Sequence, residues 1–171
     1  MSWHGGQTQQ YAMYIDGYDL LGVVEFTPPE FTQKTITLGG SGILGEIELP
    51  APGLYEKMEA EIKFNQVSQP AFKLLDLNNK LIELKAVING INGETHAIEG
   101  KGFYFAIQGS HKSFSIGAIK VGELSETAFK MELTSIEARL DGQKLFKINK
   151  LSGIVEQLGV AAIKKITDYV F

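Results

Sequence analysis

The chain has 171 residues and a formal net charge of -4, with 16 Lys and Arg against 20 Asp and Glu. Cysteine is absent, which excludes disulfides and cysteine-ligated metals and fits a reducing compartment. Arg139 is the only arginine, so the chain is a poor candidate for specific nucleic-acid binding, which relies on arginine forks. The length suits one domain, 1–171, that is large enough to fold without disulfides or bound metals.

The first residues predict neither a secretory signal nor a membrane segment. Residues 2–10 are polar and contain glycine, and no apolar run in the chain approaches the ~18 residues of a membrane span. We therefore expect a soluble protein made inside a cell, without stable membrane anchoring. Residues 1–10 are predicted to form an N-terminal arm, either disordered or packed on a partner.

The next segment predicts three strands. Tyr11–Ile15 leads into Asp16-Gly17, a dipeptide typical of hairpin turns, and Leu20–Phe26 continues as an apolar strand. Pro28-Pro29 interrupts the pattern because proline cannot donate to a central ladder. Phe31–Leu38 then alternates again and is rich in threonine, which favours a strand.

A glycine-rich stretch, 38–46, follows and is closed by Pro50-Ala51-Pro52, so we expect an extended loop over 39–53. Its segment Gly40–Gly45 matches the spacing G-x-G-x-x-G of dinucleotide sites. Such a site needs a helix directly after the glycines. Here Glu46–Leu49 alternates like a strand, which favours a flexible connector with an apolar tip over a phosphate site.

The middle of the chain predicts a strand, a short helix and a hairpin. Met58–Phe64 has strict period two, and the helix-start signal Ser68–Pro70 precedes Phe72, Leu75 and Leu77. The hairpin joins Leu81–Ile91 to Thr95–Ile107 through Asn92-Gly93. Gly109-Ser110 is expected to end that strand, and Ser113–Val121 to form one or two short strands.

The last part predicts a second hairpin and a helix. Thr127–Leu140 and Lys144–Ile148 flank the turn dipeptide Asp141-Gly142, and 150–159 is irregular. Helical spacing then predicts a C-terminal helix that covers a sheet edge or face, through Val160, Ile163, Ile166 and Val170. The fold class is therefore mainly β, an antiparallel sandwich or barrel of about eight strands with one short internal helix and a C-terminal helix.

No catalytic constellation is recognisable. The histidines share no metal-ligand spacing; they are His4, His96 and His111. Two pairs of carboxylates lie on single strand faces and predict an acidic patch: Glu46 with Glu48, and Glu59 with Glu61. A glycosidase pair needs a set separation across a cleft, which nothing in the sequence indicates. We expect no enzymatic activity, no cofactor and no metal.

A series of structural motifs resembles a known family in order along the chain. The motifs are Tyr14-Ile15-Asp16-Gly17, Leu21-Gly22-Val23-Val24, Phe26-Thr27-Pro28-Pro29, Lys34-Thr35, Gly39–Gly45, Gly53-Leu54, Met58-Glu59-Ala60, Ala138–Gly142, Phe146–Asn149 and the segment from Val160. They resemble the major tail tube protein of contractile phage tails, of the P2-like type shared with R-type bacteriocin particles. The likeness is clearest in the first third and weakest from Leu81 to Glu126. The chain departs from the family at Ile43-Leu44, where members often carry Met, at the heavier Pro50–Pro52, and in its longer first ten residues.

This resemblance implies a hexameric ring in which edge strands of neighbouring copies pair into one barrel around a lumen. Rings would stack into a tube inside a contractile sheath, together with tape measure and baseplate or tube-initiator proteins. A net negative lumen would repel phosphates and let DNA pass without specific binding; in a bacteriocin the tube would puncture a membrane. The expected location is a virion tail or bacteriocin particle, assembled in the bacterial cytoplasm. The predicted inter-subunit contacts are Gly39, Gly40, Gly42, Ile43, Leu44, Gly45, Trp3 and Val170.

Two alternatives stay open at the level of sequence. One is the tube protein of a type VI secretion system, which gene neighbours would distinguish. The other is a monomeric β-sandwich binding module, for example for carbohydrate, whose site would display aromatic side chains on a concave face. Trp3, the only tryptophan, lies in the predicted arm, which argues against this second alternative.

Overall fold

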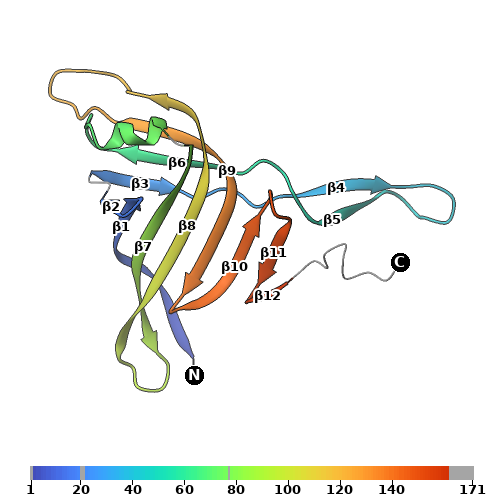
Figure 1. Cartoon of the computed structure of the whole chain (residues 1–171). Helices are drawn as coiled ribbons and strands as arrows, with labels where there is room; N and C mark the ends of the chain where they lie inside the picture. The colour runs from blue at the N-terminus through green and yellow to red at the C-terminus, as the bar shows by residue number, and fades with distance from the viewer. Residues whose placement is uncertain (1, 20–21, 77, 162–171) are drawn as a thin grey trace.

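The computed structural model describes residues 2–19, 22–76 and 78–161, and these form twelve strands and one short 3-10 helix (Figure 1). The elements in chain order are β1 (Trp3–Ile15), β2 (Tyr18–Asp19), β3 (Val23–Thr27), β4 (Gln33–Leu38), β5 (Ile47–Tyr55), β6 (Glu59–Phe64), η1 (Ala71–Asp76), β7 (Asn78–Asn92), β8 (Ile98–Ser115), β9 (Thr127–Leu140), β10 (Gln143–Asn149), β11 (Ile154–Gln157) and β12 (Val160–Ala161). The mainly antiparallel β prediction is confirmed.

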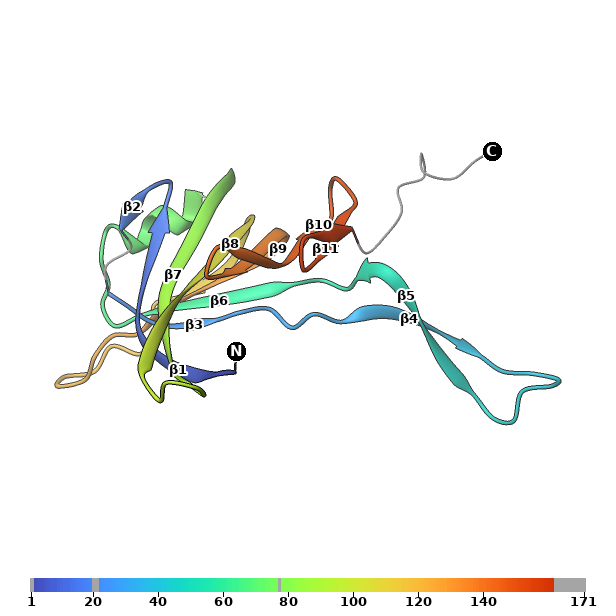
Figure 2. The ribbon, with the colours of Figure 1, turned by 90° about the horizontal axis from the view of Figure 1, so that it is seen from below.

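Ten strands form one antiparallel sheet, in the order β12-β11-β10-β9-β8-β7-β1-β2, with β6 and β3 branching from β9. The first half of β9 pairs with β6 and its second half pairs with β10. The remaining strands, β4 and β5, form a separate hairpin that projects from the body of the molecule (Figures 1 and 2). The chain therefore has a folded sheet body and one long projecting hairpin.

The branch point lies at Thr134. Apolar residues of β9 occupy odd positions up to Leu133 and even positions from Ile136. The buried ones are Phe129, Met131, Leu133, Ile136 and Ala138, and Leu140 is half-buried. The change of phase is a β-bulge, since Ser135 pairs with Gln108 whereas Leu133 pairs with Gly109. This bulge lets β9 exchange β6 for β10 while it keeps one face on the core.

The core lies where β3, β6 and η1 cover one face of the sheet. The ring of Phe129 meets Phe64 edge to face at 5.6 Å and Phe72 at 5.7 Å, which joins β9, β6 and η1. On β3, the ring of Phe26 lies 5.8 Å from that of Phe105 on β8. These contacts make one aromatic and aliphatic core from segments distant in sequence.

Two predicted two-residue turns are confirmed. Asp16-Gly17 has φ values of 47° and 81°, and Asp141-Gly142 has 51° and 79°, as a type I′ turn requires. The Asn92-Gly93 hairpin is also confirmed, although its loop is longer than two residues. The Asn92 amide donates to the carbonyl of Ala97 at 2.9 Å, closing that loop.

The two ends of the chain differ from the prediction. Residues 3–10, expected as an arm, form the first part of β1 and pair with β7. At the other end, Val160 and Ala161 form β12 rather than the start of a helix. The reason is a tight turn at Leu158-Gly159, with φ values of 51° and 81°, which folds 160–161 back onto β11. The rest of the predicted C-terminal helix lies outside the described residues.

Three further details refine the prediction. The short internal helix is confirmed as η1, although Leu77 lies outside the described residues. Gly109 does not end a strand, because β8 continues through Ser115, and 116–126 is a loop without the predicted strands. Glycine is required at 109 because a Cβ there would lie 2.1 Å from the carbonyl oxygen of Glu132.

Candidate assembly interface

The tip of the β4–β5 hairpin carries most of the predicted contact residues. The backbone adopts positive φ at Gly40, Gly42 and Gly45, with values of 138°, 91° and 100°. A hydrogen bond of 3.1 Å from the Ile43 amide to the carbonyl of Gly40 closes the tip. The structure thus brings Gly39, Gly40, Gly42, Ile43, Leu44 and Gly45 together. Leu44 is fully exposed there, so the tip presents an apolar side chain to solvent.

The stem of this hairpin is amphipathic. Ile36 lies directly opposite Leu49, and Leu38 lies directly opposite Ile47. All four side chains are exposed within this chain. Because directly opposed residues share a face, they form one apolar face, which we call the hairpin face. The other face carries Thr35, Thr37 and Glu48 by the alternation of the strand.

β5 tolerates its two prolines because it belongs to a two-stranded hairpin. Pro50 lies opposite Thr35, and Pro52 falls in the irregular stretch where the register shifts. A proline lacks the amide proton that a central strand must donate. The predicted loop 39–53 is therefore shorter, with its tip over 39–46, and 47–53 lies in β5.

Trp3 lies away from this hairpin and packs within its own chain. Its ring covers Gly5 and Gly90, where a Cβ would lie 1.9 Å and 2.5 Å from ring atoms. The ammonium of Lys101 lies 4.8 Å from the ring centroid, and the indole N–H donates to the carbonyl of Glu99 at 3.4 Å. This packing holds the N-terminal end of β1 on β7. Val170, also predicted as a contact, lies outside the described residues.

The outer edge of β1 is open over most of its length. Only Tyr14 and Ile15 pair with β2 there. Among the described strands, none pairs with the same edge over residues 3–13. An unpaired strand edge of this length exposes amide and carbonyl groups that readily pair with another chain.

The sheet has a polar face opposite the core. We define it over β1, β7, β8, the second half of β9, β10 and β11 by the side chains that alternate with the buried ones. Its charged and tyrosine side chains are Tyr14, Glu83, Lys85, Tyr104, Glu137, Arg139, Lys144, Lys147 and Glu156. The four basic residues slightly outnumber the three acidic ones.

These side chains pair with one another. Ion pairs join Lys85 to Glu83 at 3.8 Å, Arg139 to Glu137 at 2.5 Å and Lys144 to Glu156 at 3.8 Å. The pairs are partly exposed, so each contributes little to stability. Their main effect is to leave the polar face nearly neutral.

Tyr104 lies in the middle of this arrangement. The guanidinium of Arg139 lies 5.6 Å from its ring, and Lys85 is directly opposite it on β7. Partial burial and the charges of Glu83 and Glu137 raise the pKa of Tyr104 above 10, although Arg139 opposes them. The phenol therefore stays neutral at physiological pH.

The predicted acidic patch does not form around Glu59 and Glu61. Glu59 pairs with Lys112, and this hydrogen bond lowers the pKa of Glu59. Glu61 lies opposite Lys130.

Within the described residues, no three or more His, Asp or Glu side chains gather where they would hold a metal ion. In the same part of the chain, no helix has the length and apolarity needed to span a membrane.

Sequence reasoning missed two features of this interface. It treated residues 3–10 as an arm and so overlooked the open edge of β1. It also did not place the polar face, although Glu83 and Lys85 on β7, with Glu137 and Arg139 on β9, recur at period two. That alternation is the signal that would have found this face.

Comparison with known proteins gives one family and several similar folds among solved structures. A family model described as phage tail tube protein FII matches residues 7–167. No curated protein sequence matches the chain significantly. The fold is similar to a protein in the sheath/tube terminator structure of an extracellular contractile injection system, PVC, in its extended state. That match has a TM-score of 0.55 and 7% identity, and covers 77% of this chain and 94% of the other. A protein in the sheath-tube complex of the same system matches with a TM-score of 0.54 and 7% identity, over 76% and 88%.

Proposed function

The chain belongs to the phage tail tube protein FII family and is a structural tube subunit, and from this premise we propose how it assembles. Hexameric rings form when the strand edges of neighbouring copies pair, and the rings stack into the inner tube of a contractile tail. The open edge of β1 over residues 3–13 is the observation that carries this proposal. Pairing that edge with a neighbouring copy satisfies its backbone groups and closes the barrel.

The polar face lines the lumen in this arrangement. A closed ring has one inner and one outer surface, and the sheet has one polar face and one face on the core. Water-filled lumens require polar side chains, which the polar face supplies. Its three acidic residues are balanced by four basic ones, so this assignment replaces the expected net negative lumen with a nearly neutral one. Three of its four basic side chains, Lys85, Arg139 and Lys144, form ion pairs with carboxylates, which limits the positive charge that would hold DNA.

The β4–β5 hairpin makes the contact between rings. Its hairpin face exposes four aliphatic side chains, and its tip exposes Leu44. Contact with the next ring would remove this apolar surface from water. Residues 39–46 and the stem then act as one connector. Trp3 and Val170, at the two ends of the chain, are also assigned to contacts with neighbouring copies, although the Trp3 ring packs on its own chain.

Further partners follow from the tube role. The similar folds come from complexes described as sheath-tube and sheath/tube terminator assemblies. We therefore assign a sheath to the outside of the tube, a tape measure protein to the lumen, and a baseplate or tube-initiator protein to one end. The particle is a virion tail or a bacteriocin, assembled in the bacterial cytoplasm.

Sedimentation velocity of the purified full-length chain over a range of concentrations tests this function. The proposal predicts species of six copies and larger that grow with concentration, as a closed ring that stacks requires. A single monomer boundary at every concentration, in both low and high salt, would contradict it.

A further inference from the structure

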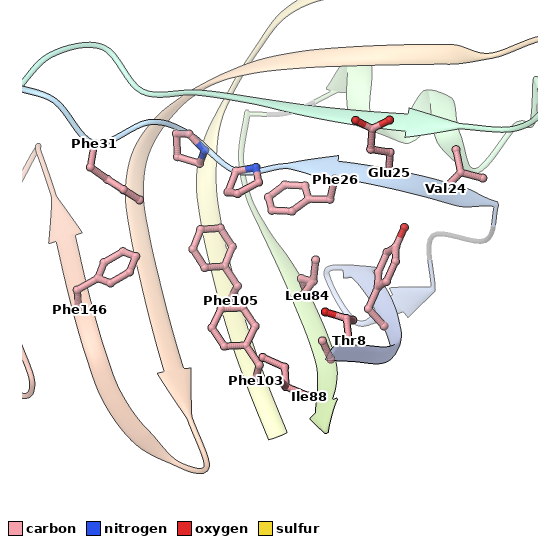
Figure 3. Close-up of a pocket in the computed structure, with 14 residues that line it drawn as sticks. Thr8, Val24, Glu25, Phe26, Phe31, Leu84, Ile88, Phe103, Phe105 and Phe146 are labelled. Carbon is pink, nitrogen blue, oxygen red and sulfur yellow. The ribbon is translucent and has the colours of Figure 1, made fainter. Parts of the chain in front are cut away.

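An apolar groove of 590 Å³ lies between β3 and the part of the sheet that β1, β7 and β8 form. Figure 3 shows Phe26 of β3 and Phe103 and Phe105 of β8 turned toward it. Glu25 is the only charged residue that lines the groove, and its carboxylate pairs with Lys63 at 3.3 Å. Aromatic walls that face solvent in the described chain need an apolar cover.

The apolar lining ends at a cation. Ile88 is the last residue of β7 that lines the groove, and Lys101 lies directly opposite it on β8. Directly opposed residues share a face, so Lys101 lies on the groove side of the sheet, where its ammonium contacts the Trp3 ring. Glu99, the next residue of β8 on this face, accepts a hydrogen bond from the Asn92 side chain at 3.1 Å. No carboxylate within the described residues forms an ion pair with Lys101, so the mouth of the groove offers an ammonium to a partner.

The β4–β5 hairpin has the complementary features. Its hairpin face is aliphatic, and its outer end carries Glu46 in the tip and Glu48 at the start of β5, both exposed. Neither carboxylate has an ion pair in the part of the chain that the structure describes. Lys34 is the only lysine of the hairpin and lies at the opposite end of the stem. The hairpin therefore combines an apolar face with an acidic outer end.

The hairpin and the groove of one chain do not meet. Figures 1 and 2 show the hairpin pointing away from the sheet body. Phe31, just before β4, lines the groove, and its ring meets that of Phe146 edge to face at 5.0 Å. This contact fixes the base of the stem at the groove wall, from which the hairpin extends outward. The two apolar surfaces can therefore cover each other only between different copies, in a heterologous contact of unlike surfaces.

We propose that the hairpin face of one copy lies along this groove in a copy of the next ring, with its acidic outer end at Lys101. The inference rests on the proposed stacking of rings and names the surface that receives the hairpin. The orientation follows from charge, because carboxylates inside the apolar lining would be buried without partners. At the mouth of the groove they meet the Lys101 ammonium instead, and Trp3 lies beside this contact.

Charge reversal tests the orientation. Lys101→Glu alone, or Glu46→Lys with Glu48→Lys, brings like charges together, and each should raise the protein concentration needed for tubes about tenfold or more. The three changes in one chain restore opposite charges and should return that concentration to within about threefold of the unaltered value. Lys120→Glu, in the loop after β8, is the matched control and should not rescue Glu46→Lys with Glu48→Lys. Equal rescue by Lys101→Glu and Lys120→Glu, or no rescue by either, would overturn the proposal.

Disulfide trapping tests the contact without relying on tubes. The protein has no cysteine, so a mixture of Leu38→Cys chains with Ile88→Cys chains offers one defined pair across the contact. Oxidation should form the mixed dimer about tenfold faster than with Thr37→Cys in place of Leu38→Cys, because Thr37 lies on the other face of the stem. This preference in a chain that forms no rings would support the contact and contradict only the ring proposal. Equal rates for the two mixtures would overturn the inference, even if rings form.

Discussion

Ile36 and Leu49 lie directly opposite each other on β4 and β5, yet their side chains are 57% and 48% exposed. A cross-strand aliphatic pair normally packs on a core. Here no other part of the described chain covers the pair. The pair is therefore the clearest sign that the hairpin is built to meet another molecule.

Substitution at the hairpin tip should block ring stacking without unfolding the chain. Ile43→Asp with Leu44→Asp would place charges in the proposed contact between rings, where their desolvation is costly. We expect rings without long tubes by electron microscopy, and an unchanged circular dichroism spectrum. Thr35→Asp with Thr37→Asp, on the polar side of the stem, is the control and should still form tubes. Long tubes formed by the first variant as readily as by the unaltered chain would contradict the role of the tip in stacking.

The glycine at position 90 should be intolerant of any side chain. A Cβ there would lie 2.5 Å from Trp3, so Gly90→Ala must displace the ring at a cost of about 1–3 kcal/mol. Because Trp3 is the only tryptophan, its fluorescence emission should shift to longer wavelength as the ring becomes solvated. Gly102→Ala, where a Cβ meets nothing within 4 Å, is the control on the neighbouring strand. An unshifted spectrum for Gly90→Ala would mean that Trp3 does not pack there.

Leu158 stores strain in the turn between β11 and β12. Its φ of 51° lies in the left-handed region, which costs a branched side chain roughly 1–2 kcal/mol. Leu158→Asn should therefore raise the midpoint of thermal unfolding, since asparagine adopts this conformation readily. Leu151→Asn, at a similarly exposed site without positive φ, should not raise the midpoint. A lower midpoint for Leu158→Asn would argue against this turn.

Ionisation of Tyr104 should weaken the fold at high pH. Burial and neighbouring carboxylates raise its pKa in the folded chain above the ordinary value of 10.0. The unfolded chain therefore loses its proton first, and stability falls as the pH rises from 10.0 through the folded pKa. Tyr104→Phe should reduce this alkaline loss in denaturant titrations at pH 9 and pH 11, whereas Tyr18→Phe, at an exposed site, should not. Equal alkaline losses in the two variants would contradict this role.

Local signals in the sequence predicted much of the fold. Asp16-Gly17 and Asp141-Gly142 are dipeptides that readily adopt the positive φ values of a two-residue turn. The identity of these residues is therefore enough to predict both hairpins. The change of phase between Leu133 and Ile136 was visible in the sequence as well. Its meaning, a bulge at which β9 changes partner, depends on strands that are distant along the chain.

The failures have equally specific causes. The chain turns at Leu158-Gly159 although leucine is a poor residue for a position with positive φ. The sequence therefore gives no clear turn signal before Val160, and its spacing pattern predicts a helix there instead. The polar and glycine-containing residues 3–10 lack strand propensity, and they pair with β7 because Trp3 packs across Gly5 and Gly90. Both outcomes are set by tertiary contacts that override local preference.

Cryo-electron microscopy of the purified full-length chain at high concentration tests the central claim most directly. The account predicts sixfold rings in which the open edge of β1 pairs with a neighbouring copy and the polar face, with Tyr104 and Arg139, surrounds the lumen. Rings with that face outward, or only monomers under every condition, would contradict it.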